Sequence, residues 1–493
     1  MVRKLKLKTE VLTLLLFSIG LVSVVLQQAL STCDYWWHLK AGEWMLDHQT
    51  LPFQDVFSWF ASEHQLYWIS HEWLSEVVLA SFNHLITTWL PGSTPHFSGY
   101  LFTCLSLFVL FGWIALFNQK YYLKNTYLTI GWFFFGALLF MSVASPRPHL
   151  MSYLLLTLTL WSLEQFRAQK GFKWLCFIPL WSFLWVNFHG GSSNLPYLLC
   201  LIYLMGGLFE FEWRGLSGKR WTLRQQKELL LITLCTFIAL IFNPHGLQMI
   251  TYPYENLQDT YMLSIIQEWQ PPLLRLNGHL LILCQLVVLV FVLLFKKKNL
   301  SLIDFLLLGG FTYLAIGSAR FAPILYILSS FILLPYLEGL ITFQQKLPLE
   351  LNRPIYQLIL GGAGFSFLLL WSFQLPLYQE TVFPTFLTPE LLSVIQEESP
   401  QRLYNHYDLG SELIYHEIPV FVDGRADLYS KNILRDAVQL GFVEQDPVTL
   451  FEKYQFDYVL TFEQSPLGYY LKTFPNATLI ASDAGVVFYE LHH

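Results

Sequence analysis

The sequence has little charge and little cysteine. Only 13% of its 493 residues are charged, about half the share usual in soluble proteins, while 54% are hydrophobic. The six cysteines form no CxxC pair and most lie inside apolar runs, which argues against disulfides and zinc. The 29 Lys and Arg residues form no basic stripe, which argues against nucleic-acid binding. This composition is typical of a chain that lies mostly within a membrane.

Long apolar runs recur along the chain. The first, 11–30, follows a basic start and is long enough to cross a bilayer core of about 30 Å, so we interpret it as a retained anchor rather than a signal peptide. Further runs lie at 99–118, 126–143, 150–166, 174–188, 195–211, 228–243, 279–295, 301–317, 322–341 and 355–373. Together they predict about 11 transmembrane helices. The segment 72–90 contains Glu72, Glu76 and His84, which is typical of an amphipathic helix on the membrane surface.

The distribution of basic residues predicts the orientation. If the N-terminus is cytoplasmic and the runs alternate, the cytoplasmic connections contain most of the 29 Lys and Arg residues. The outer loops then contain only Lys40, Arg147, Arg275 and Arg320. This asymmetry is the positive-inside pattern of membrane proteins. It predicts a multi-pass protein of a cytoplasmic membrane.

The first outer loop, 31–98, is rich in polar chemistry over residues 31–76. Its acids, histidines and tryptophans are Asp34, Glu43, Asp47, Asp55, Glu63, Glu72, Glu76, His38, His48, His64, His71, Trp36, Trp37, Trp44, Trp59, Trp68 and Trp73. Aromatic belts mark the headgroup level of a membrane. The loop therefore fits two interpretations: it carries the reacting carboxylate of a membrane enzyme, or it is an interfacial loop anchored by tryptophans.

Other polar motifs fall on the same outer side. They are ASPRPHL at 144–150, NFHGGSSN at 187–194, NPHG at 243–246, Glu268 within 247–278, and GSARFAP at 317–323. Each has a simple structural explanation, such as a proline turn at Arg147 and His149 or helix caps at Asn187 and Asn243. Their shared side nevertheless indicates one outward-facing cavity, because ionisable groups at a membrane edge are costly. Arg320 in particular requires an anionic partner there.

The pattern changes after residue 374, where charge rises and the apolar segments become short. We expect helices at 388–398, 408–416, 432–443, 447–454 and 465–473, and strands at 401–405, 419–423, 456–462, 477–482 and 485–491. These elements predict a small extracytoplasmic α/β domain, 375–493, after a transmembrane domain, 1–374. In VFVDGRADLY at 420–429, Asp423 and Arg425 follow an apolar strand, where α/β sheets place ligand contacts. A turn with a structural ion pair explains them equally.

Four segments carry a resemblance to a known family. They are DYWWHLKAGEWMLDHQTLPFQDVFSW, HEWLSE, PRPHL before an apolar run, and DLGSELIYHEIPVFVDGRADLY. In this order they resemble a bacterial group of membrane proteins with the GT-C glycosyltransferase architecture. The resemblance implies a multi-span enzyme of the cell envelope that uses a polyprenyl-phosphate sugar as donor.

The resemblance also implies roles for individual residues. GT-C enzymes carry a catalytic carboxylate in the first outer loop, and Asp34 matches its place. Many members have an adjacent acidic pair there, but Tyr35 follows Asp34, so Glu72 and Asp55 stay open as candidates. The implied assignment is Asp34 as base or acceptor-orienting group with Glu72 assisting, and Arg147, His149 and Arg320 at the phosphate. The other residues expected to line the cavity are His38, Asn187, His189, Asn243, His245 and Glu268.

A metal ion and two other functions remain open. Asp34, Glu72 and His189 are candidate ligands for Mg²⁺ or Mn²⁺, since both ions prefer oxygen donors and Mn²⁺ also accepts imidazole. A transporter or flippase is the first alternative, although it predicts ionisable groups near the bilayer midplane and an internal repeat. A non-catalytic membrane scaffold is the second. Within the enzyme class, a lipid-linked oligosaccharide ligase is not distinguished from a monosaccharide transferase.

Overall fold

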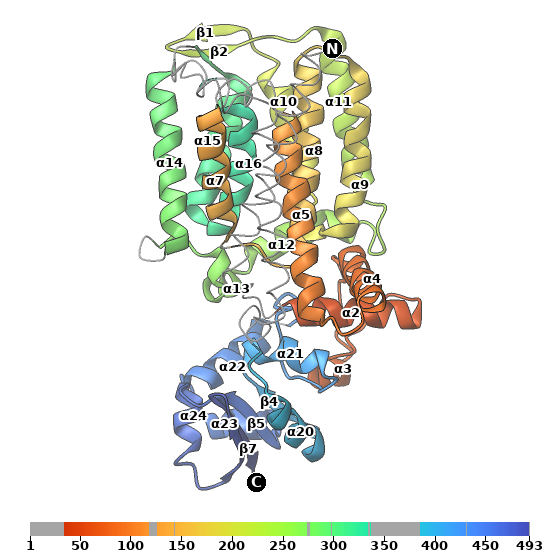
Figure 1. Ribbon diagram of the computed structural model, residues 1–493, viewed down its shortest axis with the longest axis vertical. Helices are drawn as coiled ribbons and strands as arrows, with labels where there is room; N and C mark the ends of the chain where they lie inside the picture. Colours follow the sequence, from red (N-terminus) through yellow and green to blue (C-terminus); the bar gives the residue numbers. More distant parts are fainter. Residues whose placement is uncertain are drawn as a thin grey trace. The chain divides into compact units, whose positions relative to one another are not determined.

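The computed structural model describes residues 34–117, 126–141, 143–273, 277–296, 298–333, 336, 385–429 and 431–492. The predicted spans 11–30 and 355–373 and the predicted domain boundary at 374 lie outside these residues. The described chain is mostly helical with a small sheet near its C-terminal end (Figure 1). It forms two compact units, which we call the helical unit (100–253 and 266–336) and the mixed unit (34–99, 254–265 and 385–492).

The helical unit consists of long, roughly parallel helices (Figure 1). They are the main part of α5 (Pro95–Phe117), α7 (Thr126–Met141), α8 (His149–Arg167), α9 (Ile178–Phe188), α10 (Leu195–Gly206), α11 (Leu223–Ala239), α14 (Asn277–Phe295), α15 (Leu302–Gly317) and α16 (Ala322–Ile332). Shorter elements join them: η1 (Phe172–Phe177), η2 (Gly190–Ser192), α12 (Gln248–Gln258), η3 (Gln267–Trp269), η4 (Ala319–Phe321), and a sheet of β1 (Phe211–Trp213), β2 (Leu216–Gly218) and β3 (Leu300–Ser301). The apolar runs predicted within the described residues fall on these helices.

Helix length and hydropathy identify one candidate membrane span among the described residues. Among the described residues, α5 alone is both long and apolar enough to cross a bilayer, with a mean hydropathy of 2.2. Shorter apolar helices lie at Phe172–Phe188, Leu280–Phe295, Leu302–Gly317 and Ala319–Ile332. The predicted number of membrane spans therefore stays a prediction.

A partly buried ion pair joins α8 and α15 within the helical unit. The Arg167 guanidinium donates to both Asp304 carboxylate oxygens, at 2.6 and 3.0 Å, and to Ser301 Oγ at 2.8 Å. Tyr203 on α10 and Tyr336 donate to Glu164 and Asp304 at 2.6 and 2.9 Å. This bidentate, fully hydrogen-bonded geometry offsets the cost of burying the charges.

The mixed unit combines three early helices with the C-terminal segment. Its elements are α2 (Tyr35–His48), α3 (Trp59–Glu63), α4 (Trp73–Trp89), α13 (Thr260–Ile265), α20 (Pro389–Glu398), η6 (Tyr407–Leu409), α21 (Gly410–Tyr415), α22 (Lys431–Phe442), α23 (Pro447–Tyr454), α24 (Pro466–Leu471), and strands β4 (Leu403–Asn405), β5 (Tyr458–Phe462), β6 (Ala477–Asp483) and β7 (Val486–Leu491). The helix predicted at 72–90 and most elements predicted after residue 388 are confirmed. Their starts are well marked because Thr388, Asp446 and Ser465 cap helices whose first residue is proline.

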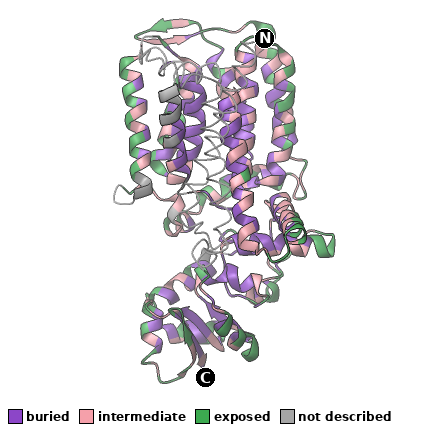
Figure 2. Cartoon of the chain, viewed as in Figure 1, coloured by how far each residue is buried: buried purple, intermediate pink, exposed green. Residues whose placement is uncertain are grey.

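The sheet of the mixed unit has the strand order β4-β5-β7-β6. β4 and β5 are parallel, with Leu403 opposite Tyr458, and the other two pairs are antiparallel. The inner strands are almost wholly buried, whereas β6 lies at the edge and is largely exposed (Figure 2). The sheet therefore forms the core against which the C-terminal helices pack.

The prediction of a strand at 419–423 is wrong. Val420 forms a single parallel bridge with Ser58 of the first loop: its N–H donates to the Phe57 carbonyl at 3.2 Å, and its carbonyl accepts from the Trp59 N–H at 3.0 Å. The next N–H, of Phe421, donates to the Asn405 side chain at 2.8 Å. The segment is apolar because it is buried, but its backbone bonds go to a loop and a side chain instead of a strand.

Helices α2 and α4 approach each other closely at Gly42. A Cβ atom at this position would lie 2.0 Å from the Glu76 carbonyl oxygen and 2.9 Å from Ala80 Cβ. Since the obstructing atom belongs to the backbone of α4, only glycine allows this separation. The packing brings the polar residues of both helices together.

We expect Gly42→Ala to destabilise the folded chain by about 1–3 kcal/mol, because the methyl group forces α2 and α4 apart. The matched control is Gly309→Ala, also within a helix, where an added Cβ meets nothing within 4 Å. That control should be neutral or stabilising by up to about 1 kcal/mol. Thermal unfolding of the two purified variants in detergent tests the prediction. Equal melting of both variants would contradict it.

Candidate active site

Asp34 lies at the start of α2, and its half-buried carboxylate meets the backbone of Gly424. A Cβ atom on Gly424 would lie 2.2 Å from Asp34 Oδ1 and 3.1 Å from Trp37 Nε1. The Trp37 indole N–H is buried and has no hydrogen-bond partner among the described residues. The carboxylate and this N–H therefore meet beside a glycine of the DGRAD segment, 423–427, where no side chain can intrude.

Further polar groups surround Asp34 from the C-terminal segment. Burial first, and then the charges of Asp34 and Asp423, raise the pKa of Tyr407 well above its usual value. Asp427, which is exposed, acts electrostatically on Tyr407 and on Glu76. The Tyr407 hydroxyl therefore stays protonated at neutral pH, close to several carboxylates.

A histidine and two glutamates gather where α2 meets α4. His38 Nδ1 lies 3.1 Å from Glu76 Oε1, and His38 Nε2 lies 3.9 Å from Glu72 Oε2. His71 Nε2 also approaches Glu72, at 3.8 Å. His38 and Glu76 are 2% and 1% exposed, and burial first and then the Glu72 charge raise the pKa of Glu76 well above its usual value. The cluster is largely buried and contains two closely spaced carboxyl groups.

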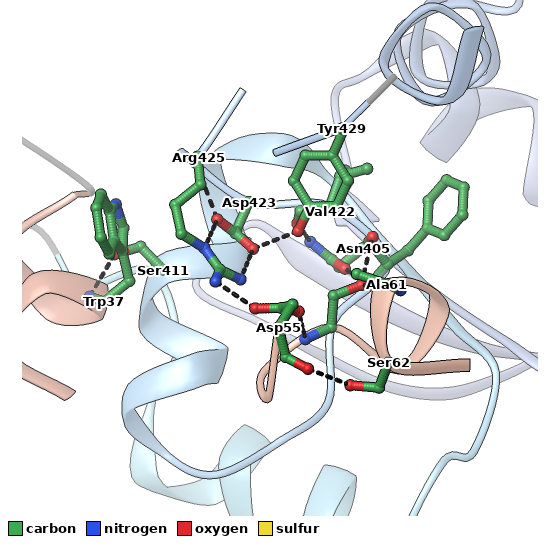
Figure 3. Close-up of polar contacts among 12 residues, drawn as sticks. Trp37, Asp55, Ala61, Ser62, Asn405, Ser411, Val422, Asp423, Arg425 and Tyr429 are labelled. Carbon is green, nitrogen blue, oxygen red and sulfur yellow. Dashed lines mark hydrogen bonds and ion pairs between the residues drawn. The ribbon is translucent and has the colours of Figure 1, made fainter. Parts of the chain in front are cut away.

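Arg425 is the centre of a second, fully buried cluster (Figure 3). Its guanidinium donates to Asp423 at 2.8 and 2.7 Å and also to Asp55 Oδ1, while Tyr429 donates to Asp423. The Trp68 ring lies 4.6 Å from the guanidinium carbon. Burial alone would raise the pKa of Asp423, but the Arg425 charge and the hydrogen bonds from Arg425 and Tyr429 hold it below its usual value.

This cluster excludes Asp55, Asp423 and Arg425 from direct contact with a substrate. Asp55 Oδ1 accepts from Arg425 and Asp55 Oδ2 accepts from the Ser58 N–H at 2.7 Å, so neither oxygen is available to an acceptor hydroxyl. All three side chains are at most 3% exposed. They form an ion pair between the first loop and the C-terminal segment.

Backbone contacts hold α2 against the same segment. The Trp37 N–H donates to Ser411 Oγ at 3.0 Å, as Figure 3 shows. On the next turn of α2, Lys40 pairs with Glu417 at 2.6 Å. Asp34 is thus positioned by contacts on both the buried and the exposed side of its helix.

The predicted phosphate residues come together within the helical unit. Arg147 Nη1 donates to Glu268 Oε1 at 2.6 Å, and the Arg320 guanidinium lies over the Trp269 ring at 4.8 Å. The Arg147 charge, and to a lesser extent that of Arg320, lowers the pKa of Glu268 to about 2, although burial acts in the opposite direction. The His149 Nε2–H group donates a hydrogen bond to the Val143 carbonyl at 2.8 Å. Two arginines and one carboxylate leave this group of side chains with a net positive charge.

The asparagines and the remaining histidines have local partners. Asn187 donates to the Phe183 and Phe242 carbonyls at 2.8 and 3.0 Å, and Asn243 donates to Leu240 and Gly246 at 2.6 and 3.1 Å. Asn243 Oδ1 also accepts from the His245 N–H at 2.7 Å. His189 is 4% exposed and lies 2.6 and 2.9 Å from the Ser152 and Ser192 hydroxyls. These contacts terminate helices and close turns.

The predicted site residues therefore form two sets. Asp34, His38 and Glu72 lie together in the mixed unit, and Arg147, His149, Glu268 and Arg320 lie together in the helical unit. Sequence reasoning missed Glu76 as a site residue, although its spacing of four from Glu72 places both on one helix face. It also missed Gly424 and Asp427, although both lie in the VFVDGRADLY motif at 420–429, and Tyr407, for which the sequence carries no signal.

We expect Arg425→Met to destabilise the folded chain by about 3–5 kcal/mol, because it leaves two buried carboxylates without a counter-charge. The matched control is Arg224→Met, which removes an exposed pair with Glu228 and should cost about 0.5 kcal/mol or less. Thermal unfolding of both full-length variants gives the comparison. A loss in Arg425→Met no larger than in the control would contradict the role of the cluster.

No known protein family and no curated protein sequence matches the chain. Among solved structures it is similar to the archaeal oligosaccharyltransferase AglB from Archaeoglobus fulgidus in complex with an inhibitory peptide and a dolichol-phosphate: 12% identity, TM-score 0.47, covering 97% of this chain and 74% of that chain. It is also similar to ArnT from Cupriavidus metallidurans bound to undecaprenyl phosphate: 11% identity, TM-score 0.46, covering 96% of each chain.

Proposed function

We propose that this chain is a glycosyltransferase of a bacterial cytoplasmic membrane that moves a sugar from a polyprenyl-phosphate carrier to an extracytoplasmic acceptor. The observation that carries the proposal is the Asp34 carboxylate, which meets the Gly424 backbone beside the unpartnered Trp37 N–H. It stands at the position of the catalytic carboxylate in the family that the sequence resembles. The basic charge pattern favours the placement of this loop outside the membrane.

Asp34 acts as the base in this reaction. As the acceptor oxygen forms a bond to the anomeric carbon of the sugar, the bond from that carbon to the carrier phosphate breaks. The acceptor proton passes to the Asp34 carboxylate, and the bonding electrons leave with the phosphate. Trp37 Nε1, which is buried beside Asp34, is placed to offer a hydrogen bond to the carboxylate. Glu72 remains the second candidate for the base.

The group around Arg147 and Arg320 supports a phosphate-binding role. Arginine binds phosphate through paired, planar N–H donors and is the residue best suited to a membrane-edge anion. Arg147 is oriented by Glu268, and Arg320 rests on the Trp269 ring. The net positive charge of this group would also offset the negative charge of a bound phosphate.

We expect Asp34→Asn to abolish sugar transfer, because the amide cannot accept a proton, while the folded protein is retained. The assay incubates the full chain in lipid nanodiscs with a panel of polyprenyl-phosphate sugars and lipid-linked oligosaccharides. Free polyprenyl phosphate is measured by mass spectrometry. The matched control is Asp47→Asn, an exposed aspartate near the end of the same helix, which should keep full activity.

Undiminished transfer by Asp34→Asn would remove Asp34 from the mechanism. If wild-type protein releases no carrier from any donor, the proposal of a transferase fails, and transport becomes the function to test. Release from an oligosaccharide donor only would identify a ligase.

We expect Arg320→Met to raise the donor concentration needed for half-maximal rate by about tenfold, as loss of one charged hydrogen bond predicts. The control is Arg435→Met, which removes a similar arginine, 5.0 Å over the Tyr261 ring in the mixed unit. Initial rates against donor concentration measure the effect. Equal values for both variants would exclude Arg320 from donor binding.

A further inference from the structure

The His38, Glu72 and Glu76 cluster has the geometry of a metal site. One ligand atom from each residue can be chosen so that all three lie within 4.8 Å of one another. Glu72 is the N-cap residue of α4 and Glu76 lies in its first turn, where the Glu76 N–H donates to the Glu72 carbonyl at 3.1 Å. His38 faces them from α2, at the approach that Gly42 allows. Within the described residues this is the only such group.

Hydrogen bonding within the cluster leaves one carboxylate oxygen of Glu76 without a partner. Glu76 Oε2 is buried and has no hydrogen-bond partner among the described residues, while Glu76 Oε1 is shared with His38. A protonated His38 has two N–H groups, one toward each glutamate, and so cannot reach Oε2. A buried carboxylate oxygen without a partner is costly, and nearby Arg425 is already committed to Asp423 and Asp55.

We propose that His38, Glu72 and Glu76 bind a divalent transition-metal cation. One imidazole and two carboxylates are a donor set that Mn²⁺ or Zn²⁺ accepts, whereas Mg²⁺ and Ca²⁺ prefer oxygen donors alone. The ion neutralises both carboxylates and satisfies the orphan oxygen of Glu76. His189, which the sequence analysis named as a candidate ligand, is not a member of this group, and its Nδ1 atom contacts the Ser152 and Ser192 hydroxyls.

The site lies next to the proposed base without including it. Asp34 and His38 are four residues apart on α2, and the His38 N–H donates to the Asp34 carbonyl at 3.2 Å. Three protein ligands leave at least one coordination position open, as in catalytic metal centres. The metal site does not rest on the proposed sugar transfer, since its geometry holds whatever the reaction.

The experiment measures metal binding directly. The full chain in nanodiscs is stripped with a chelator and titrated with Mn²⁺, and bound ion is followed by electron paramagnetic resonance. Zn²⁺ then competes for the same site. The test variant is Glu76→Gln, which keeps the shape of the side chain and the contact to His38. The matched control is Glu43→Gln, a half-buried glutamate on α2 outside the cluster.

We expect one Mn²⁺ equivalent in wild type and in the control, displaced by Zn²⁺. Loss of a partner that only orients a metal ligand weakens metal binding by roughly 10- to 100-fold. Because Glu76 is proposed as a ligand itself, Glu76→Gln should weaken Mn²⁺ binding by at least that factor. Glu72→Gln, at the more exposed position, should weaken Mn²⁺ binding in the same way. It replaces Glu76→Gln as the test variant if Glu76→Gln fails to fold. Equal binding by wild type and both glutamine variants, or none by wild type, would overturn the proposal. Because no turnover is measured, failure here is distinct from failure of sugar transfer.

Discussion

The buried guanidinium of Arg425 holds the mixed unit together, because it neutralises carboxylates from two distant segments. Asp423 belongs to its own loop and Asp55 to the first loop, and none of the three is more than 3% exposed. A charge in such surroundings is stable only with its partners. The same contact fixes the loop that carries Gly424, against which the Asp34 carboxylate rests. The position of the proposed base therefore depends on an ion cluster that takes no part in the chemistry.

Local structure in the mixed unit is largely predictable from the sequence. Proline and its preceding cap mark the starts of α20, α23 and α24, and short runs of consecutive apolar residues mark β5 and β7. The segment 419–423 shows why pattern alone is insufficient. Its apolar residues predict a strand, but the backbone of Val420 pairs with a loop more than 350 residues earlier. Periodicity reports burial and says nothing of which segment supplies the partner.

The candidate site is predictable only in part for the same reason. Asp34, His38 and Glu72 are recognisable because acids and histidines crowd into one loop, and Arg147 and Arg320 because Lys and Arg are rare in the outer loops, with His149 in the same PRPHL motif as Arg147. The structure adds neighbours that come from other segments, such as Gly424, Tyr407 and Asp427. It also gives Asn187, Asn243 and His189 local hydrogen-bonding partners. A sequence shows residue types, but their partners depend on tertiary packing.

The 370 residues between Asp55 and Arg425 constrain how the chain is made. Domains generally fold as units during synthesis, starting from the N-terminal end. Here the first loop is synthesised and exposed long before Arg425 exists, and contacts of such sequence separation form slowly. Until then Asp55 must remain solvated, and α2 lacks its bond to Ser411. The loop with the proposed base thus acquires its final contacts last, so a truncated or stalled chain lacks the partners that hold Asp34 in place even where its early helices are complete.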